Sequence, residues 1–259
     1  MSTIKFKIAL LATGLGLLLS NSFTIAAYAQ AFSGRGIPGR REGAGTRGCT
    51  LESPQPSPAG RTIAINGKSS PNLVALIPES NIGATLAAYP TFFWYVPANS
   101  LKVGRFTLYD SYGANRKKLY ETRLNLDGTP GVISLRLPDN GTVPPLELNR
   151  TYYWVFRVFC DPLDRSGDLQ VEGFVQRVKA SASLEERLRT ATARERPTIY
   201  AASGLWHETL ISLVELRQAN PNDRSVQTDW ESLMQVIRLE SLAKEAIVPC
   251  CQVQASSSR

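Results

Sequence analysis

In the stretch Leu148–Cys160, every second residue from Tyr152 to Cys160 is apolar and falls on one face: Tyr152, Trp154, Phe156, Val158 and Cys160. This period of two predicts a long central strand with an apolar core face. The opposite face, which includes Tyr153, Val155 and Phe159, is mostly apolar as well. We therefore expect another element to cover the outer side of this strand.

Seven or eight strand-like runs fill residues 61–180, with turn signals between them and no helical pattern. Gly128–Gly131 and Asp139–Gly141 are the strongest of these turns. This arrangement predicts an immunoglobulin-like antiparallel β-sandwich, with a small closed barrel as the alternative. A leucine shortly before Tyr152 and Tyr153 fits the tyrosine corner of such sandwiches.

The hydrophobic period becomes helical after Lys179. Ser183–Glu186 reads as a capping box that opens a short helix. An apolar stripe then begins at Trp206, and Asn220–Asp223 stops and restarts the pattern. Residues 181–249 are thus predicted as a helical hairpin region, and the fold class as α+β, a sandwich followed by helices.

One part of this helical region resembles half of a tetratricopeptide repeat, through Gly204, Trp206, Thr209, Leu213, Leu216 and Pro221. Independent arrays of such repeats usually need three or more units. We find one, so we expect a single hairpin that docks on the sandwich. The outer apolar face of the central strand is its predicted docking place.

The first 29 residues have the pattern of a secretory signal peptide. Two lysines precede an apolar run at residues 8–19, and Ala27–Ala29 offers a small-x-small cleavage site before Gln30. A retained membrane anchor is the alternative, but the apolar run is short for a span. We expect export to the periplasm, the cell envelope or the extracellular space, with no membrane span in the mature chain.

Residues 30–60 are rich in Gly, Arg and Pro and predict a flexible leader. We favour a solvated linker over attraction to an anionic surface through Arg35, Arg40, Arg41 and Arg47. Residues 250–259 form a short C-terminal tail. The formal net charge is +7 and falls to +5 without Lys5 and Lys7. Because the positive charges are scattered, we do not predict a nucleic-acid partner.

Four cysteines lie beyond the signal peptide, at Cys49, Cys160, Cys250 and Cys251, and they allow three disulfide pairings. Export permits disulfides, and a Cys49–Cys160 bond would close a loop of about 110 residues, worth ~4–5 kcal/mol in the chain-entropy model. The alternative is that Cys160 is a small buried thiol. Adjacent Cys250 and Cys251 would strain a mutual bond, so a metal-binding or redox pair, an intermolecular link and terminal thiols all stay open.

We find no nucleophile elbow, phosphate loop or zinc-protease motif. The lone His207 is predicted to be a partly exposed structural residue. The acidic loop with Asp161, Asp164 and Asp168 does not match an EF-hand. Arg116–Lys118 reads as a solvated hairpin loop and Phe92–Tyr95 as core. The sequence therefore predicts no catalytic, cofactor-binding or metal residues, and no enzyme.

Several segments together resemble the cyanobacterial exported family catalogued as domain of unknown function 928. They are the leader ending at Cys49, Tyr89–Pro97, Gly128–Gly131, Tyr152–Asp161, Val171–Arg177 and Asn220–Asp223. The resemblance implies a periplasmic or envelope location and brings no established activity and no catalytic residues.

We therefore expect a non-enzymatic binding or adaptor protein of the cell envelope, with a protein partner. The alternative is a module that binds an envelope glycan or another anionic polymer through its basic leader and loop aromatics. A third hypothesis is an enzyme with carboxylates that no motif identifies. The sequence does not predict an oligomeric state.

Overall fold

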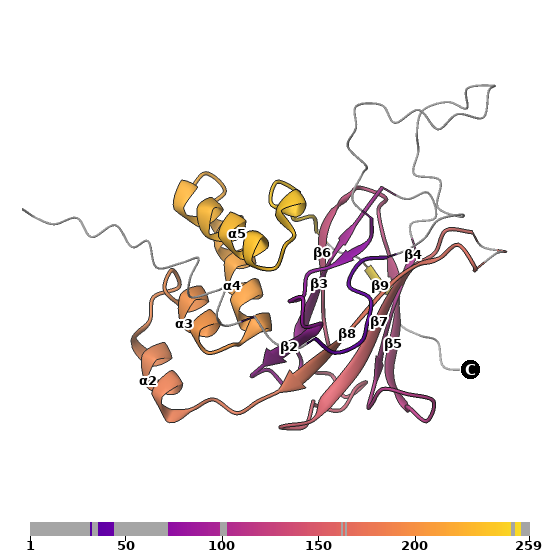
Figure 1. Cartoon of the computed structure of the whole chain (residues 1–259), viewed down its shortest axis with the longest axis horizontal. Helices are drawn as coiled ribbons and strands as arrows, with labels where there is room; N and C mark the ends of the chain where they lie inside the picture. Colours follow the sequence, from indigo (N-terminus) through magenta and orange to yellow (C-terminus); the bar gives the residue numbers. More distant parts are fainter. Residues whose placement is uncertain are drawn as a thin grey trace, which may run out of the picture.

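The computed structural model describes residues 32, 36–43, 72–98, 103–161, 163, 165–249 and 252–254. This part of the chain contains two β-sheets and four α-helices, so the predicted α+β class is confirmed. The helices, the smaller sheet and the larger sheet follow one another as three layers (Figure 1).

The smaller sheet has three antiparallel strands in the order β1-β3-β6. They are β1 (Val74–Ala75), β3 (Thr91–Val96) and β6 (Gly131–Arg136). The sequence of β3, TFFWYV, is apolar on both faces, and all of its residues after Thr91 are buried. A strand of this kind suits the middle layer, where both faces are covered.

The larger sheet has six strands in the order β2-β8-β7-β4-β5-β9. They are β2 (Ile82–Thr85), β8 (Leu169–Arg177), β7 (Thr151–Val158), β4 (Val103–Tyr109), β5 (Lys118–Asn125) and β9 (Gln252–Gln254). β2 pairs with β8 in parallel, whereas the other neighbours are antiparallel. The prediction of a purely antiparallel fold is therefore wrong at this edge, because the chain crosses from β1 into the second sheet.

The main core lies between the two sheets. Trp94 of β3 stacks on Phe156 of β7 with ring centroids 4.4 Å apart, and Phe92 lies 5.7 Å from Trp154. The inward residues of β7 are all buried. Both the core face predicted within Leu148–Cys160 and the core placement of Phe92–Tyr95 are confirmed.

Four helices follow β8: α2 (Ala182–Thr190), α3 (Arg196–Ala202), α4 (Trp206–Ala219) and α5 (Arg224–Val236), before the short helix η1 (Glu240–Leu242). Ser181 caps α2 by accepting the Leu184 N–H at 3.2 Å. The capping box predicted at Ser183–Glu186 is therefore wrong by two residues. Asp223 caps α5 through Ser225 N at 2.8 Å. In the described part of the chain, no helix has the length and apolar character needed to cross a membrane.

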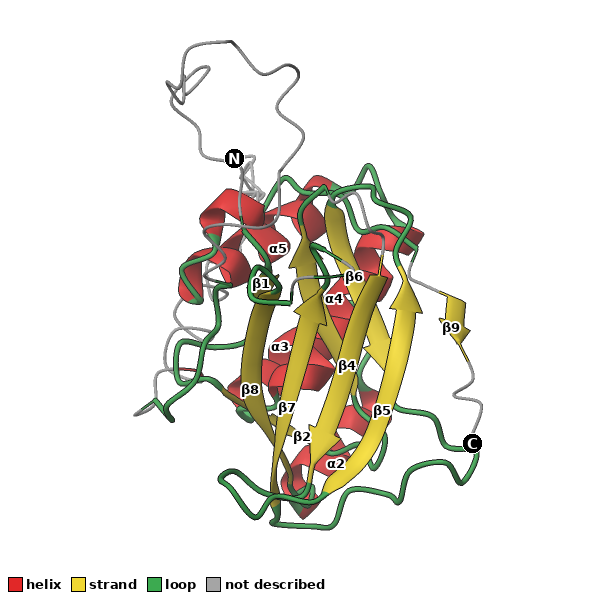
Figure 2. Cartoon of the chain, turned by 90° about the vertical axis from the view of Figure 1, so that its right-hand side faces the viewer, coloured by secondary structure: helices red, strands yellow, loops and turns green. Residues whose placement is uncertain are grey.

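The helices pack on the outer face of the smaller sheet. Buried residues of α4 and α5, such as Trp206, Leu213 and Trp230, share one cluster with Phe93 and Tyr95 of β3. The prediction that the helices cover the outer face of the central strand is therefore wrong. The second apolar face of β3 receives them instead, and none of the helices in the described part lies over the outer face of β7 (Figure 2).

The outer face of β7 is covered in part by residues 36–43. Ile37 packs against the cluster of Tyr153, Val155 and Phe174. The Arg40 carbonyl accepts Glu172 N of β8 at 2.8 Å, and the Arg41 carbonyl accepts Ala75 N at 2.8 Å. For these eight residues the prediction of a flexible linker is wrong, because their backbone is hydrogen-bonded to both sheets. Arg35, Arg47 and the rest of 44–60 lie outside the described residues.

Candidate functional site

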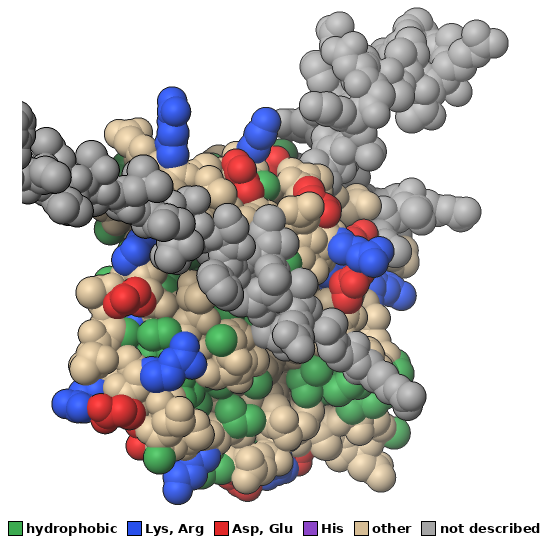
Figure 3. All heavy atoms as spheres, turned by 60° about the vertical axis from the view of Figure 1, so that its left-hand side comes forward, with side chains coloured by type: hydrophobic (Ala, Val, Ile, Leu, Met, Phe, Trp, Pro, Cys, Tyr) green, Lys and Arg blue, Asp and Glu red, His purple; other side chains and the backbone are tan. Residues whose placement is uncertain are grey.

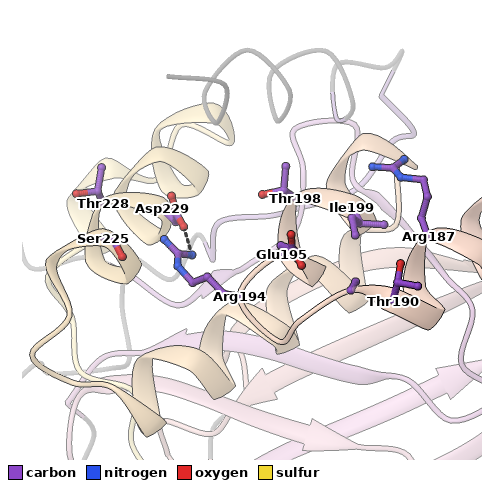
Figure 4. A pocket seen from close by; sticks show the side chains of 10 residues that line it. Arg187, Thr190, Arg194, Glu195, Thr198, Ile199, Ser225, Thr228 and Asp229 are labelled. Carbon is purple, nitrogen blue, oxygen red and sulfur yellow. Dashed lines mark hydrogen bonds and ion pairs between the residues drawn. The ribbon is translucent and has the colours of Figure 1, made fainter. Parts of the chain in front are cut away.

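A cleft of about 880 Å³ opens between α2, α3 and α5 (Figure 4). Ser225, Thr228 and Asp229 of α5 line one side, and Arg187 and Thr190 of α2 line the other. Its floor comes from α3 and from the loop that precedes it. Acidic, basic and hydrophobic side chains are interspersed on this side of the molecule (Figure 3).

The loop between α2 and α3 is held by Glu195. Its carboxylate accepts hydrogen bonds from Thr192 N at 2.9 Å and Thr192 Oγ1 at 2.8 Å. These two hydrogen bonds lower the pKa of Glu195 below its usual value, and the bond from Thr192 N has the larger effect. Pro197 then starts α3 at its first turn, where a missing N–H costs little. The loop thus presents Arg194 to α5.

Arg194 forms an ion pair with Asp229 across the cleft. Asp229 is 7% exposed, so its charge needs this partner. The pair ties the α2–α3 loop to α5 and leaves the carboxylate of Asp229 occupied.

Arg187 has a different place in the cleft. It is exposed on α2, and no ion pair of Arg187 occurs among the described residues. Ser225 Oγ donates to Asp223 and Thr228 Oγ1 donates to the Arg224 carbonyl, so these two hydroxyls present acceptor lone pairs to the cleft. The cleft therefore combines one available guanidinium with several hydroxyl oxygens, a set suited to binding a carboxylate with neighbouring N–H groups.

The first turn of α4 carries a second polar cluster, and it joins the helices to the sandwich. Trp206 Nε1 donates to the Leu76 carbonyl at 3.1 Å. Glu208 Oε1 accepts from Thr85 Oγ1 at 2.7 Å and from Leu86 N at 2.8 Å. Two side chains from the first turn of α4 thus connect the helices to both sheets.

His207 lies in the same turn and is 6% exposed, so the prediction of a partly exposed residue is wrong. Its Nδ1 is 2.9 Å from the Thr91 carbonyl. Burial lowers the pKa of His207, and the ring is neutral at physiological pH. Gly83 permits this approach, because a Cβ there would lie 2.8 Å from His207 Nε2.

The remaining candidates from the sequence do not converge on one site. Arg116 lies over the Tyr109 ring at 4.7 Å, and Asp168 pairs with Arg165 at 3.5 Å. Asp164 lies outside the described residues. Among those described, no three His, Cys, Asp or Glu side chains are grouped as metal ligands.

The pairing of Cys49 with Cys160 stays a prediction. Cys160 follows β7, is half-buried and packs against the main core. Cys49, Cys250 and Cys251 lie outside the described residues.

One protein-family model, described as Domain of Unknown Function (DUF928), matches residues 42–247. This match covers the sandwich and the helices that form the cleft. No curated protein and no solved structure matches the chain.

Proposed function

We propose, from the premise that this chain belongs to the DUF928 family, that it is a non-enzymatic binding or adaptor protein. The family description assigns no activity, so the proposal depends on the geometry of this chain. The ligand site is the cleft between α2, α3 and α5.

The observation that carries the proposal is the cleft, whose volume of about 880 Å³ falls in the usual range of ligand sites. Its two carboxylates are committed to the fold: Asp229 pairs with Arg194, and Glu195 holds Thr192. General acid–base catalysis needs a pKa near the working pH, whereas that of Glu195 is lowered. This arrangement favours binding over proton transfer.

The available Arg187 and the hydroxyl acceptors favour a partner segment that carries a carboxylate beside backbone N–H groups. An extended stretch of a protein with an acidic side chain has this chemistry. The ligand would lie along α3, with its carboxylate at Arg187 and its N–H groups toward α5.

A photoreactive amino acid at Thr198, inside the cleft, tests the proposal in the producing cell. We expect a discrete crosslinked protein, lost when Arg187→Glu is added. Arg189→Glu is the matched control, because Arg189 lies on the same helix and outside the cleft lining. The same probe at exposed Asn140 should give no such product. Equal crosslinking from Thr198 and Asn140, or no product from Thr198, would refute the cleft as a partner site.

We also propose that the protein is exported to the cell envelope of a cyanobacterium. The basic start, apolar run and small-x-small site support export, and the family resemblance supports the origin and the envelope. N-terminal sequencing of the protein from the producing cell should begin at Gln30. A chain that keeps Met1 in the cytoplasmic fraction would contradict export.

We further infer an immunoglobulin-like sandwich from the strand order. β1-β3-β6 corresponds to strands A, B and E, and β8-β7-β4-β5 to G, F, C and C′. Tyr152 OH accepts Glu147 N at 2.9 Å, the hydrogen bond expected of a tyrosine corner near the start of strand F. An experimental structure with another order of strands would contradict this assignment.

A further inference from the structure

Three arginines stand side by side on the outer face of the larger sheet, away from the cleft. Arg105 of β4 is the register partner of Arg123 on β5 and of Arg157 on β7. Register partners project from the same face, so the three side chains form a row across adjacent strands about 4.8 Å apart. We call Arg105, Arg123 and Arg157 the arginine row. Their strands face the viewer in Figure 2.

Like charges at directly opposed positions destabilise a sheet unless anions neutralise them. Within the described ranges, no ion pair involves the arginine row. The nearest carboxylates on this face have other partners: Glu121 contacts Lys118 and Thr107, and Glu172 accepts from Tyr153 OH at 2.5 Å. The repulsion is therefore not relieved by these neighbours.

Three guanidinium groups lie around the ring of Phe159 at the end of the row. Its buried ring lies 5.0 Å from the guanidinium of Arg105, 5.9 Å from that of Arg123 and 3.5 Å from that of Arg165. The Nε of Arg105 is buried and has no hydrogen-bond partner among the described atoms. Cation–π contacts position these groups, yet they do not neutralise charge.

The part of the chain outside the described residues holds few carboxylates that could serve as counterions. Outside the described residues the sequence has only two acidic side chains, Glu52 and Asp164. The three arginines of the row outnumber these two carboxylates, whereas Arg165 beside them already pairs with Asp168. An external polyanion fits the charge.

Aromatic rings occupy the other end of the same face. Tyr109, four residues along β4 from Arg105 and hence about 13 Å away, stacks on Tyr153 with centroids 5.8 Å apart. The ring of Tyr112 packs edge-on against that of Tyr153, with centroids 5.0 Å apart, and Tyr112 is 60% exposed. Its ring is one of the few large apolar groups left open to solvent in the described part.

We propose that this face binds an acidic polysaccharide. Carboxylates of the polymer contact the arginine row, and a sugar ring further along the chain stacks on Tyr112. Glu121 on β5 and Glu172 on β8 lie between these two ends along the strands, in one register row with Thr107 and Val155 between them. Carboxylates there accept hydrogen bonds from sugar hydroxyls, whereas they would repel the dense charge of a nucleic acid.

The full chain, with polygalacturonate, dextran and double-stranded DNA as probes, tests the proposal at low and moderate salt. We expect binding to polygalacturonate that weakens with salt, and none to neutral dextran. The double variant Arg123→Gln/Arg157→Gln should bind polygalacturonate at least about tenfold more weakly, since each charge-assisted contact contributes about that factor. Arg136→Gln, an exposed arginine on a strand of the other sheet, should bind as the wild type does.

Stability separates a binding site from a structural role. Removing like charges from the row should leave the Tm of the double variant unchanged or higher, and polygalacturonate should raise the Tm of the wild type only. Tyr112→Ala should weaken binding several-fold with only a small fall in Tm, because the ring is 60% exposed and has few contacts to lose. Equal binding by the double variant would overturn the proposal, and so would DNA binding as tight as that of polygalacturonate. The cleft variant Arg187→Glu should retain this binding, which keeps the two proposals separable.

Discussion

Glu208→Ala tests how the helices are attached to the sandwich. Glu208 Oε1 accepts from Thr85 Oγ1 at 2.7 Å, from Leu86 N at 2.8 Å and from Ala87 N at 3.3 Å. Alanine removes this acceptor while the three donors stay in place. Thr85 is fully buried, and the other two are half-buried.

The two short bonds determine the magnitude. A hydrogen bond to a charged group contributes about 1.5–3 kcal/mol, which gives an upper bound near 6 kcal/mol for two. Water reaches the half-buried Leu86 N–H and replaces part of that bond. Glu208 Oε2 is buried with no partner among the described atoms, so its removal returns some desolvation energy. We expect a net loss of about 2–3 kcal/mol in the free energy of unfolding.

Urea unfolding followed by tryptophan fluorescence measures this loss, because Trp206 and Trp230 lie in the core beneath α4. Glu215→Ala is the matched control: it is the same change on the same helix at an exposed position, and it should cost less than about 0.5 kcal/mol. Glu208→Gln keeps one acceptor oxygen and should fall between them. Equal losses for Glu208→Ala and Glu215→Ala would refute the attachment described here.

Three other outcomes follow from single contacts. Because burial lowers the pKa of His207, the unfolded chain takes up a proton below pH 6.5 that the folded ring does not. The free energy of unfolding should therefore fall below pH 6.5 by up to about 1.4 kcal/mol per pH unit. His207→Gln should make the urea midpoint less dependent on pH between pH 5 and 7, and an unchanged pH profile would contradict the buried neutral ring. Tyr152→Phe loses the hydrogen bond from Glu147 N and should cost about 1 kcal/mol by urea titration, whereas no loss would mean that this bond is not formed. Peptide mapping without reductant should link Cys49 to Cys160; a link from Cys160 to either C-terminal cysteine would disprove that pairing.

Local patterns predicted the strands well because burial on one face imposes a period of two. In β7 the alternation of Tyr152, Trp154 and Phe156 marked the core face, and these side chains are buried. The layer order was not predictable in this way. β3 and β7 both carry apolar residues on two faces, and the pattern alone does not say which second face receives helices.

The cleft escaped prediction because distant residues of unremarkable type form it. Arg194 and Asp229 are 35 positions apart, and each reads as an ordinary surface charge in its own helix or loop. The arginine row has the same origin, since register across three strands brings Arg105, Arg123 and Arg157 together. Residues 36–43 were misjudged because composition does not count backbone hydrogen bonds, and Ile37 was their one apolar signal.

The buried middle sheet stays partly uncovered for a time during synthesis on the ribosome. β6 ends at Arg136 and α4 ends at Ala219, so the apolar outer side of β3 and β6 is translated well before the helix that covers it. At 5–20 residues per second, the roughly 80 intervening residues take about 4–16 s. During that delay Phe93 and Tyr95 have no partner from α4, and nascent chains would be most prone to aggregate at this stage.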